Sequence, residues 1–191
     1  MKKILNTLLL VTPLSTYTMD QEGLRKLHDE VGKNNIEYVS KILAQYPDAA
    51  QYQGNDKDTA LHVAARESSE GMISLLIDTG NAQVEAQNKT GNAPLTIAAY
   101  RGNKEGVAAL IVHGAKVNAI NVGKYTPLHS AAIQGNACIA QMLLMAGAAR
   151  NIANNGNETP LDLARKNMQE NGEIIELLET FQGPALSDTP Q

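Results

Sequence analysis

A four-residue phrase recurs along the chain at a nearly constant interval, and this repeat limits the possible folds more than any other feature. The copies begin at positions 59, 93, 126 and 159, so successive copies are 34, 33 and 33 residues apart. A unit of this length cannot bury its own apolar faces, so neighbouring units must stack into a solenoid. The four phrases are Thr59-Ala60-Leu61-His62, Ala93-Pro94-Leu95-Thr96, Thr126-Pro127-Leu128-His129 and Thr159-Pro160-Leu161-Asp162.

The residues of each unit predict two helices and an all-α fold. A Thr hydroxyl can accept a hydrogen bond from the first turn of a helix, and a Pro that follows has no amide hydrogen to leave unsatisfied. An Ala pair continues the first helix in three units, and Gly102 and Gly135 are placed to end it in a left-handed conformation. A second apolar run then predicts a second helix, which ends near Gly80, Gly114 or Gly147 in three units. These runs are residues 73–77, 107–111, 139–144 and 174–178.

The phrase, its period and the Gly-Ala pair after the second helix resemble the ankyrin repeat, a 33-residue unit with the signature Thr-Pro-Leu-His-x-Ala. The resemblance implies a solenoid of stacked helix-turn-helix units with short hairpin connectors, and a protein that works by binding another protein. It covers residues 58–181. We assign the repeats to residues 59–92, 93–125 and 126–158, and an irregular C-terminal cap to residues 159–181.

The connectors depart from the family pattern. The family places Gly two residues before the Thr, whereas this chain has Lys57, Gly91, Lys124 and Asn157 there. The hairpin geometry of three connectors is therefore left open. The connector after Gly80 is one residue longer than the next, and Asn81 is the predicted insertion.

Both ends of the stack are irregular. Residues 20–57 contain two apolar stripes at helical spacing and are predicted to form a degenerate N-terminal capping repeat. Residues 182–191 are rich in Gly, Pro and Ser and are predicted to be a disordered tail. The stripes are formed by Leu24, Leu27 and Val31, and by Ile36, Val39, Ile42 and Leu43.

Residues 1–18 have the architecture of a signal peptide, with a basic start and an apolar run too short to span a bilayer. Cleavage is predicted after Thr18. We therefore expect an exported, periplasmic or secreted protein. The alternative is that the segment packs on the first repeat as an apolar cap, and the protein is then cytoplasmic.

Composition restricts the classes of partner. The net charge of −4 with mixed signs argues against a nucleic-acid binder. The single Cys138 excludes an intrachain disulfide and a thiolate zinc site, and we expect this side chain to face neighbouring helices. Polar residues interrupt every later apolar run, so no membrane association of the mature form is expected. We expect a monomer.

No catalytic, cofactor-binding or metal-binding residues are predicted. His62 and His129 lie in the repeated phrase, where each can hydrogen-bond back to Thr59 or Thr126. His28 and His113 have no second ligand at a usable spacing. Carboxylates are scattered, and phosphate-binding loops and nucleophile motifs are absent from the sequence. The interpretation is that the protein is not an enzyme.

The family resemblance places a partner on the connector tips and the ends of the first helices. Among the residues at these positions, Tyr and Arg are enriched at binding hot spots, and an Ile that faces solvent has no folding role. We therefore predict a hot spot on the second and third repeats. The candidate partner-binding residues are Arg66, Tyr100, Arg101, Tyr125, Ile133 and Gln134.

The short Lys-Lys signal and the Asn- and Lys-leaning composition predict a bacterial protein, and two functions fit a bacterial exported binding module. One is a host-directed effector that engages host proteins, and the other is a periplasmic binder that inhibits or protects a bacterial enzyme. A third hypothesis, an enzyme on an ankyrin scaffold, requires a convergent set of titratable groups that the sequence does not show. The identity of the partner does not follow from the fold.

Overall fold

The computed structural model describes residues 20–54, 56–67, 69–166 and 172–182. In these segments the regular elements are ten α-helices and one 3-10 helix, η1. The predicted all-α solenoid is thus confirmed. The bounds are α1 Gln21–Gly32, α2 Ile36–Gln45, η1 Pro47–Gln51, α3 Ala60–Glu67, α4 Glu70–Asp78, α5 Pro94–Arg101, α6 Lys104–Val112, α7 Pro127–Ile133, α8 Ala137–Met145, α9 Pro160–Lys166 and α10 Gly172–Thr180.

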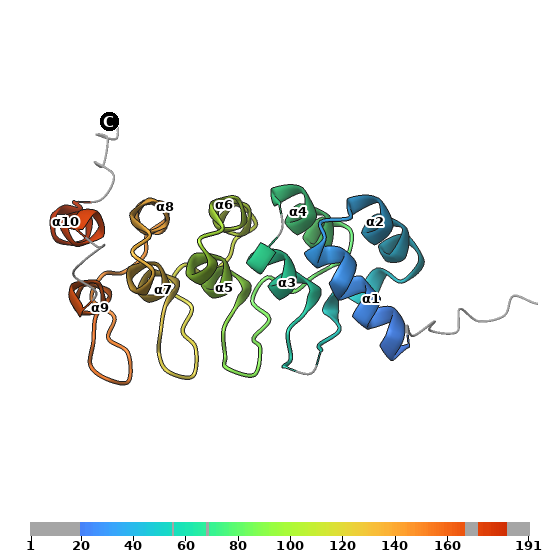
Figure 1. The fold of residues 1–191 in the computed structure, drawn as a ribbon, viewed down its shortest axis with the longest axis horizontal. Helices are drawn as coiled ribbons and strands as arrows, with labels where there is room; N and C mark the ends of the chain where they lie inside the picture. The colour runs from blue at the N-terminus through green and yellow to red at the C-terminus, as the bar shows by residue number, and fades with distance from the viewer. Residues whose placement is uncertain (1–19, 55, 68, 167–171, 183–191) are drawn as a thin grey trace, which may run out of the picture.

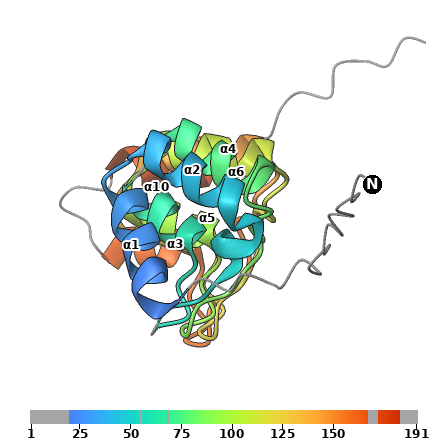
Figure 2. The same cartoon turned by 90° about the vertical axis from the view of Figure 1, so that its right-hand side faces the viewer.

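The helices form two parallel rows (Figure 1). The first helices of the units, α1, α3, α5, α7 and α9, contact one another in sequence order, and so do the second helices α2, α4, α6, α8 and α10. The connectors project from the row of first helices, and the view along the stack shows them overlapping on one side (Figure 2). This arrangement leaves the connectors and the ends of the first helices on a common face.

The core is a continuous column of small and aliphatic side chains between the two rows. Leu61, Leu95 and Leu128 are fully or almost fully buried at the same position of three successive units. The Ala pairs beside them are also buried, so the first helices of neighbouring units approach closely. Each unit therefore completes the core of the next, as expected for a repeat that cannot bury its apolar faces alone.

The N-terminal unit consists of α1, α2 and η1. Of the predicted stripes, Leu27, Val31, Val39 and Leu43 are buried, Leu24 and Ile42 are partly buried, and Ile36 is exposed. The 3-10 helix η1 was not anticipated from the sequence, and its residues Ala49 and Ala50 are buried in the core. The predicted signal peptide 1–18, the connection 167–171 and residues 183–191 of the predicted tail lie outside the described residues.

The connector turns have the same backbone geometry whether or not they contain Gly. Lys57, Lys124 and Asn157 adopt φ values of +59°, +59° and +58°, and Gly91 adopts +77°. A left-handed conformation costs a Lys roughly 1–2 kcal/mol, so the turn must be held by other interactions. The three connectors without Gly at this position thus form the same turn as the one that has it, although their residues disfavour it.

Asn side chains hold three of these turns, those at Gly91, Lys124 and Asn157. Asn121 Oδ1 accepts from the amides of Gly123 and Tyr125 at 2.9 Å, and Asn154 Oδ1 accepts from those of Gly156 and Glu158. Asn88 has the same role in the preceding connector. Backbone hydrogen bonds also join neighbouring tips, for example from Asn155 N to Gly123 O at 3.0 Å.

The extra residue of the 34-residue spacing lies directly after α4. Ala115 N and Ala148 N each bond the carbonyl five residues back, whereas Ala82 N bonds Leu76 O, six residues back. Asn81 takes the left-handed conformation, with φ +50°, that Gly114 takes in the next unit. Gly80 is buried, and a Cβ there would lie 2.7 Å from Leu76 O. Gly80 and Asn81 together thus replace a single Gly.

The repeated His residues cap their own helix and bridge to the next unit. The amides of Thr59 and Thr126 donate to Nδ1 of His62 and His129 at 3.1 and 3.0 Å, so the predicted link to the capping Thr is confirmed. Because Nδ1 accepts, Nε2 carries the proton. His62 Nε2 therefore donates to the carbonyl of Asn92, and His129 Nε2 to that of Glu158.

The buried His rings make the free energy of unfolding dependent on pH. Burial lowers the pKa of His28, His62 and His129 below the ordinary value, because it disfavours the charged ring. Below about pH 6.5 the unfolded chain therefore binds more protons than the folded chain, and the free energy of unfolding falls as the pH decreases. Urea denaturation at a series of pH values should show this loss. A double variant His62→Gln, His129→Gln should show a shallower dependence, and an unchanged slope would contradict this assignment.

Candidate functional site

A groove of about 310 Å³ lies over α5 and α7, between the ends of these helices and the bases of their connectors. We call it the central groove. Its walls combine aromatic, aliphatic and small polar side chains with two Arg residues. It is lined by Arg66, Asn92, Thr96, Ile97, Tyr100, Arg101, Asn121, Tyr125, Ser130 and Ile133.

The groove lies where the repeated His is missing. The third helical position is His62 in α3 and His129 in α7, and each ring reaches a carbonyl of the following connector. In α5 the same position holds Thr96, which is buried and lines the groove. By the repeat register, an imidazole ring at this position of α5 would reach the carbonyl of Tyr125, which also lines the groove. The shorter side chain of Thr96 therefore leaves room between adjacent units.

Five of the six predicted partner-binding residues line this groove. Tyr100 is 48% exposed and Arg101 is exposed, and both stand at the end of α5. Ile133 ends α7, and Arg66 lies near the end of α3. Gln134 is exposed but is not one of the lining residues. The structure thus brings together residues that are distant in sequence, as the repeat register predicts.

Three of these residues are less free than the sequence suggested. Tyr125 is half-buried, because its ring packs edge-on against His129 with centroids 5.6 Å apart. Ile133 is partly exposed, so it faces solvent only in part. Arg66 forms an ion pair with Asp58 at 2.6 Å. These residues support the fold as well as shaping the groove, and Tyr100 and Arg101 are the most accessible lining residues of the predicted set.

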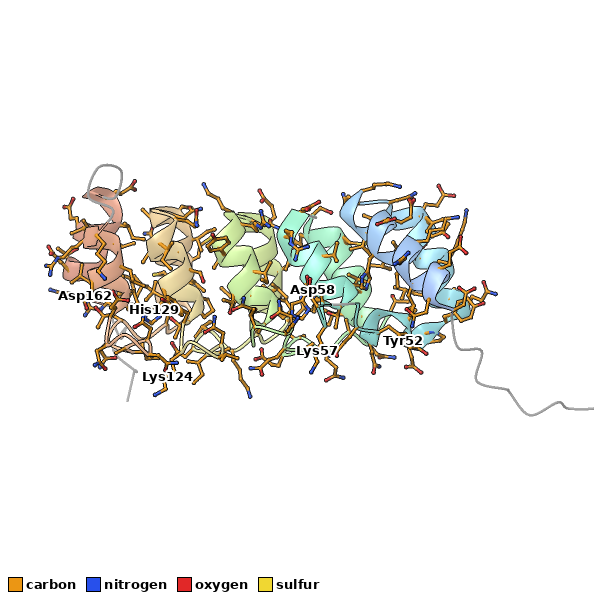
Figure 3. The ribbon with its side chains drawn as sticks, turned by 60° about the horizontal axis from the view of Figure 1, so that its bottom comes forward. Tyr52, Lys57, Asp58, Lys124, His129 and Asp162 are labelled. Carbon is orange, nitrogen blue, oxygen red and sulfur yellow. The ribbon has the colours of Figure 1, made fainter. Side chains whose placement is uncertain are left out.

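The ion pair of Arg66 fixes one end of the groove. Asp58 Oδ2 accepts from Arg66 and Oδ1 accepts from Asn88 at 2.9 Å, so the carboxylate joins two connectors to α3. Burial opposes the charge of Asp58, but these two hydrogen bonds outweigh it and hold the pKa of the carboxyl below its ordinary value. Figure 3 shows Asp58 and Lys57 on this face, with Lys124 and His129 farther along the stack.

The positive charge around the groove was not predicted, because the prediction used the net charge of the whole chain, in which positive and negative residues are mixed. The chain has 20 Asp and Glu residues, yet Glu105 is the only one between Ala86 and Asn157. The same segment has six Lys and Arg residues. No carboxylate is among the residues that line the central groove. A count of charge by repeat, in place of the count over the whole chain, would have found this basic centre between acidic ends.

Cys138 is exposed, so the expectation that it faces neighbouring helices is wrong. Ile139, Ala140 and Leu143 occupy the buried face of α8. Cys138 immediately precedes Ile139 in α8, and this offset around the helix places it on the solvent side. It does not line the central groove.

The remaining histidines form no metal site in the part of the chain that the structure describes, where no cluster of three His, Cys, Asp or Glu residues has suitable geometry. His113 lies 3.4 Å from Asp78 of the preceding unit. His28 Nε2 is buried and has no hydrogen-bond partner among the described atoms. Within the same described segments, each helix is too short or too polar to cross a bilayer.

A larger hollow of about 860 Å³ lies at the N-terminal unit, between α1 and residues 52–54. Tyr52, labelled in Figure 3, belongs to its wall. Its other lining residues are mostly charged or polar, including Glu22, Arg25 and Asp29. Its aromatic residue Tyr52 is half-buried, and Leu24 is its one aliphatic lining residue. The central groove has the exposed Tyr100 and two Ile residues, and it is therefore the better candidate for protein recognition.

Comparisons with known proteins extend the structural result. Two family models for ankyrin repeats match residues 27–121 and 110–164, so together they extend from within α1 to within α9. The chain is 30% identical over 108 residues to the E3 ubiquitin-protein ligase KEG of Arabidopsis thaliana. It is 31% identical over 94 residues to the nuclear factor NF-kappa-B p105 subunit of Gallus gallus, and 35% identical over 80 residues to the ARF GTPase-activating protein Git of Drosophila melanogaster.

These alignments cover 52%, 49% and 42% of this chain, but only 7%, 10% and 11% of the three relatives. The names of the three relatives indicate different activities, so what this chain shares with them is the repeat array. Arrays of this kind are modules for protein–protein interaction. From the repeated phrase, the stacked helix pairs and the two family matches, the chain belongs to the ankyrin-repeat family.

Proposed function

We propose that this protein is a non-catalytic binding module and that its protein partner docks on the central groove. The observation that carries the proposal is the pairing of an exposed Tyr100 with an exposed Arg101 beside the aliphatic walls formed by Ile97 and Ile133. Tyr and Arg beside an apolar pocket are the usual composition of a binding hot spot. Neither residue is needed to fill the core.

The titratable groups nearest the groove support binding over catalysis. His62 and His129 are held by capping Thr residues on one side and by carbonyl groups on the other. Asp58 is held by Arg66 and Asn88. Groups engaged in this way stabilise the stack, and a general acid or base would instead need to reach a substrate.

Replacing Tyr100 should separate binding from folding. Tyr100→Ala removes an aromatic ring at the groove edge, and the partner should bind at least about ten-fold more weakly, as for a hot-spot residue. The melting temperature should stay close to that of the wild type because the ring is about half exposed. The partner is first captured by affinity purification and identified by mass spectrometry, and its affinity is then measured by calorimetry.

The matched control is Val112→Ala, which truncates an apolar side chain that is 81% exposed at the end of α6 and does not line the groove. This variant should bind the partner as the wild type does. Equal affinities for Tyr100→Ala and the wild type would contradict the assignment of the groove.

Thr96→His should close the groove and stabilise the fold. The new ring can accept from the amide of Ala93 and donate to the carbonyl of Tyr125, as His62 and His129 do in their own units. Each additional hydrogen bond contributes about 1 kcal/mol, so thermal unfolding should show a melting temperature at or above that of the wild type. Partner affinity should fall, and a stabilised variant that still binds normally would place the partner elsewhere.

We further propose that the protein is exported by a bacterium and acts on a host protein. The basic start and short apolar run of residues 1–18 support export. The alternative is a periplasmic binder that inhibits or protects a bacterial enzyme. Both roles use the same binding face, and they differ in where the partner is found.

Export predicts that the secreted or periplasmic protein lacks residues 1–18. Mass spectrometry of the protein purified from cell fractions should find an N-terminus at Met19. A protein that retains Met1 in the cytoplasmic fraction would contradict export. Capture of a host protein by the mature chain would favour the effector role, and capture of a periplasmic enzyme would favour the alternative.

A further inference from the structure

We propose that the partner presents an extended acidic segment, with one apolar side chain in the central groove and flanking carboxylates paired with Arg101 and Lys124. This inference rests on the proposed function and specifies the chemistry of the partner. It depends on three observations. These are the distribution of charge along the chain, the cations Arg101 and Lys124, which have no ion-pair partner among the described residues, and the apolar walls of the groove.

The charge distribution separates the middle of the stack from its ends. Residues 86–157 carry six Lys and Arg and one carboxylate, Glu105, which lies in the first turn of α6. The rest of the chain carries ten Lys and Arg and 19 Asp and Glu, so the excess of negative charge is confined to the ends. A negatively charged partner is attracted to the middle units and repelled by the ends.

The cations at the groove edge have no ion-pair partner among the residues that the structure describes. Arg101 ends α5 and is exposed, and Lys124 is exposed at the tip of the connector that leads to α7. By contrast, Arg66 is paired with Asp58, and Lys166 with Glu158. Lys89, exposed at the preceding tip, is a third cation on this face without an ion pair in the described segments. A partner that supplies carboxylates would complete these pairs.

The walls of the groove favour a peptide with an apolar side chain. Ile97, Ile133 and the rings of Tyr100 and Tyr125 provide apolar surface. The volume of about 310 Å³ is at the low end for ligand pockets. It therefore suits one side chain of an extended segment.

The same observations favour an acidic peptide over a nucleic acid. A nucleic-acid site needs Lys and Arg clustered along one surface. Three other cations of the middle units lie outside the groove lining: Arg150 donates to the carbonyl of Leu178 in α10, Lys104 begins α6, and Lys116 follows the end of α6. Within the described part of the chain, the exposed cations of the groove face without an ion pair are Lys57, Lys89, Arg101 and Lys124, and they are few for such a cluster because the carboxylates of Asp56 and Asp58 flank Lys57.

Fluorescence anisotropy with labelled peptides tests the inference. The probes are short capped peptides with Asp and Glu on both sides of a central Leu, Ile, Phe or Tyr, and neutral analogues with Asn and Gln in place of the acids. The acidic peptides should bind the full chain at least about ten-fold more tightly than the neutral analogues. The difference should shrink as salt is raised, because exposed charges are screened over about 10 Å at moderate ionic strength.

Charge reversal locates the contact. The double variant Arg101→Glu, Lys124→Glu should lose most of the binding of the acidic peptides. The control Arg25→Glu, Lys41→Glu changes the net charge equally at exposed positions of α1 and α2, and it should bind as the wild type does. If the first double variant does not fold, the salt dependence and the blocked groove of Thr96→His provide the same test in folded protein.

The outcomes separate this inference from the proposed function. Failure of every acidic peptide to bind, or equal binding of the neutral analogues, overturns the acidic segment. The proposed function survives that result if a captured partner binds Tyr100→Ala more weakly than the wild type, and it fails if the partner binds both with equal affinity. Tight, salt-dependent binding of a single-stranded oligonucleotide that the acidic peptides do not displace would assign the basic centre to nucleic acid and overturn the inference.

Discussion

Burial of the apolar faces between successive helix pairs is the interaction on which the remainder of this structure depends. Leu61, Leu95 and Leu128 are buried only because the neighbouring unit covers them, and the Ala pairs beside them allow the first helices to approach closely. The stability of such a stack is a sum of contributions from units and from the interfaces between them. A weak interface can therefore persist in the middle of the array if its neighbours are strong.

The interfaces in this stack are unequal in their polar contacts. His62 and His129 each bridge to the following connector, and Asn side chains together with tip-to-tip hydrogen bonds fix the connectors in register. The side chain of Thr96 is too short for such a bridge from α5, and the candidate site lies at that interface. Thr96 thus omits one polar contact between two units and leaves space for a ligand at the same place. Function in this array follows from a local departure from the repeat.

The fold could be predicted because the repeat is read from spacing alone. Four copies of the phrase define the helix starts, and the capping role of His62 and His129 follows from the chemistry of Thr and His at that separation. The turns at Lys57 and Lys124 could not be predicted. Asn121 Oδ1 accepts hydrogen bonds within the Lys124 turn, and backbone hydrogen bonds join both tips to neighbouring tips. The 3-10 helix η1 also gave no periodic signal, since it spans only five residues.

The candidate site was predicted in part, for a related reason. Register alone places Tyr100, Arg101 and Ile133 on one face, and it cannot show how deeply each is buried. Register does not determine the packing of Tyr125 on His129, the partial burial of Ile133 or the exposure of Cys138, because a small rotation of a helix changes each of them. The basic centre was present in the sequence but was averaged away in the net charge of the whole chain.

A repetitive surface presents a problem of alignment, because a ligand that fits one unit can shift by one repeat and fit the next nearly as well. The acidic ends of this chain and its basic centre remove that degeneracy, since a negatively charged ligand displaced by one unit in either direction leaves part of its favourable field. Thr96 removes it sterically, because His62 and His129 occupy the equivalent space on either side. The irregular residues thereby restrict the ligand to a single register on a periodic scaffold.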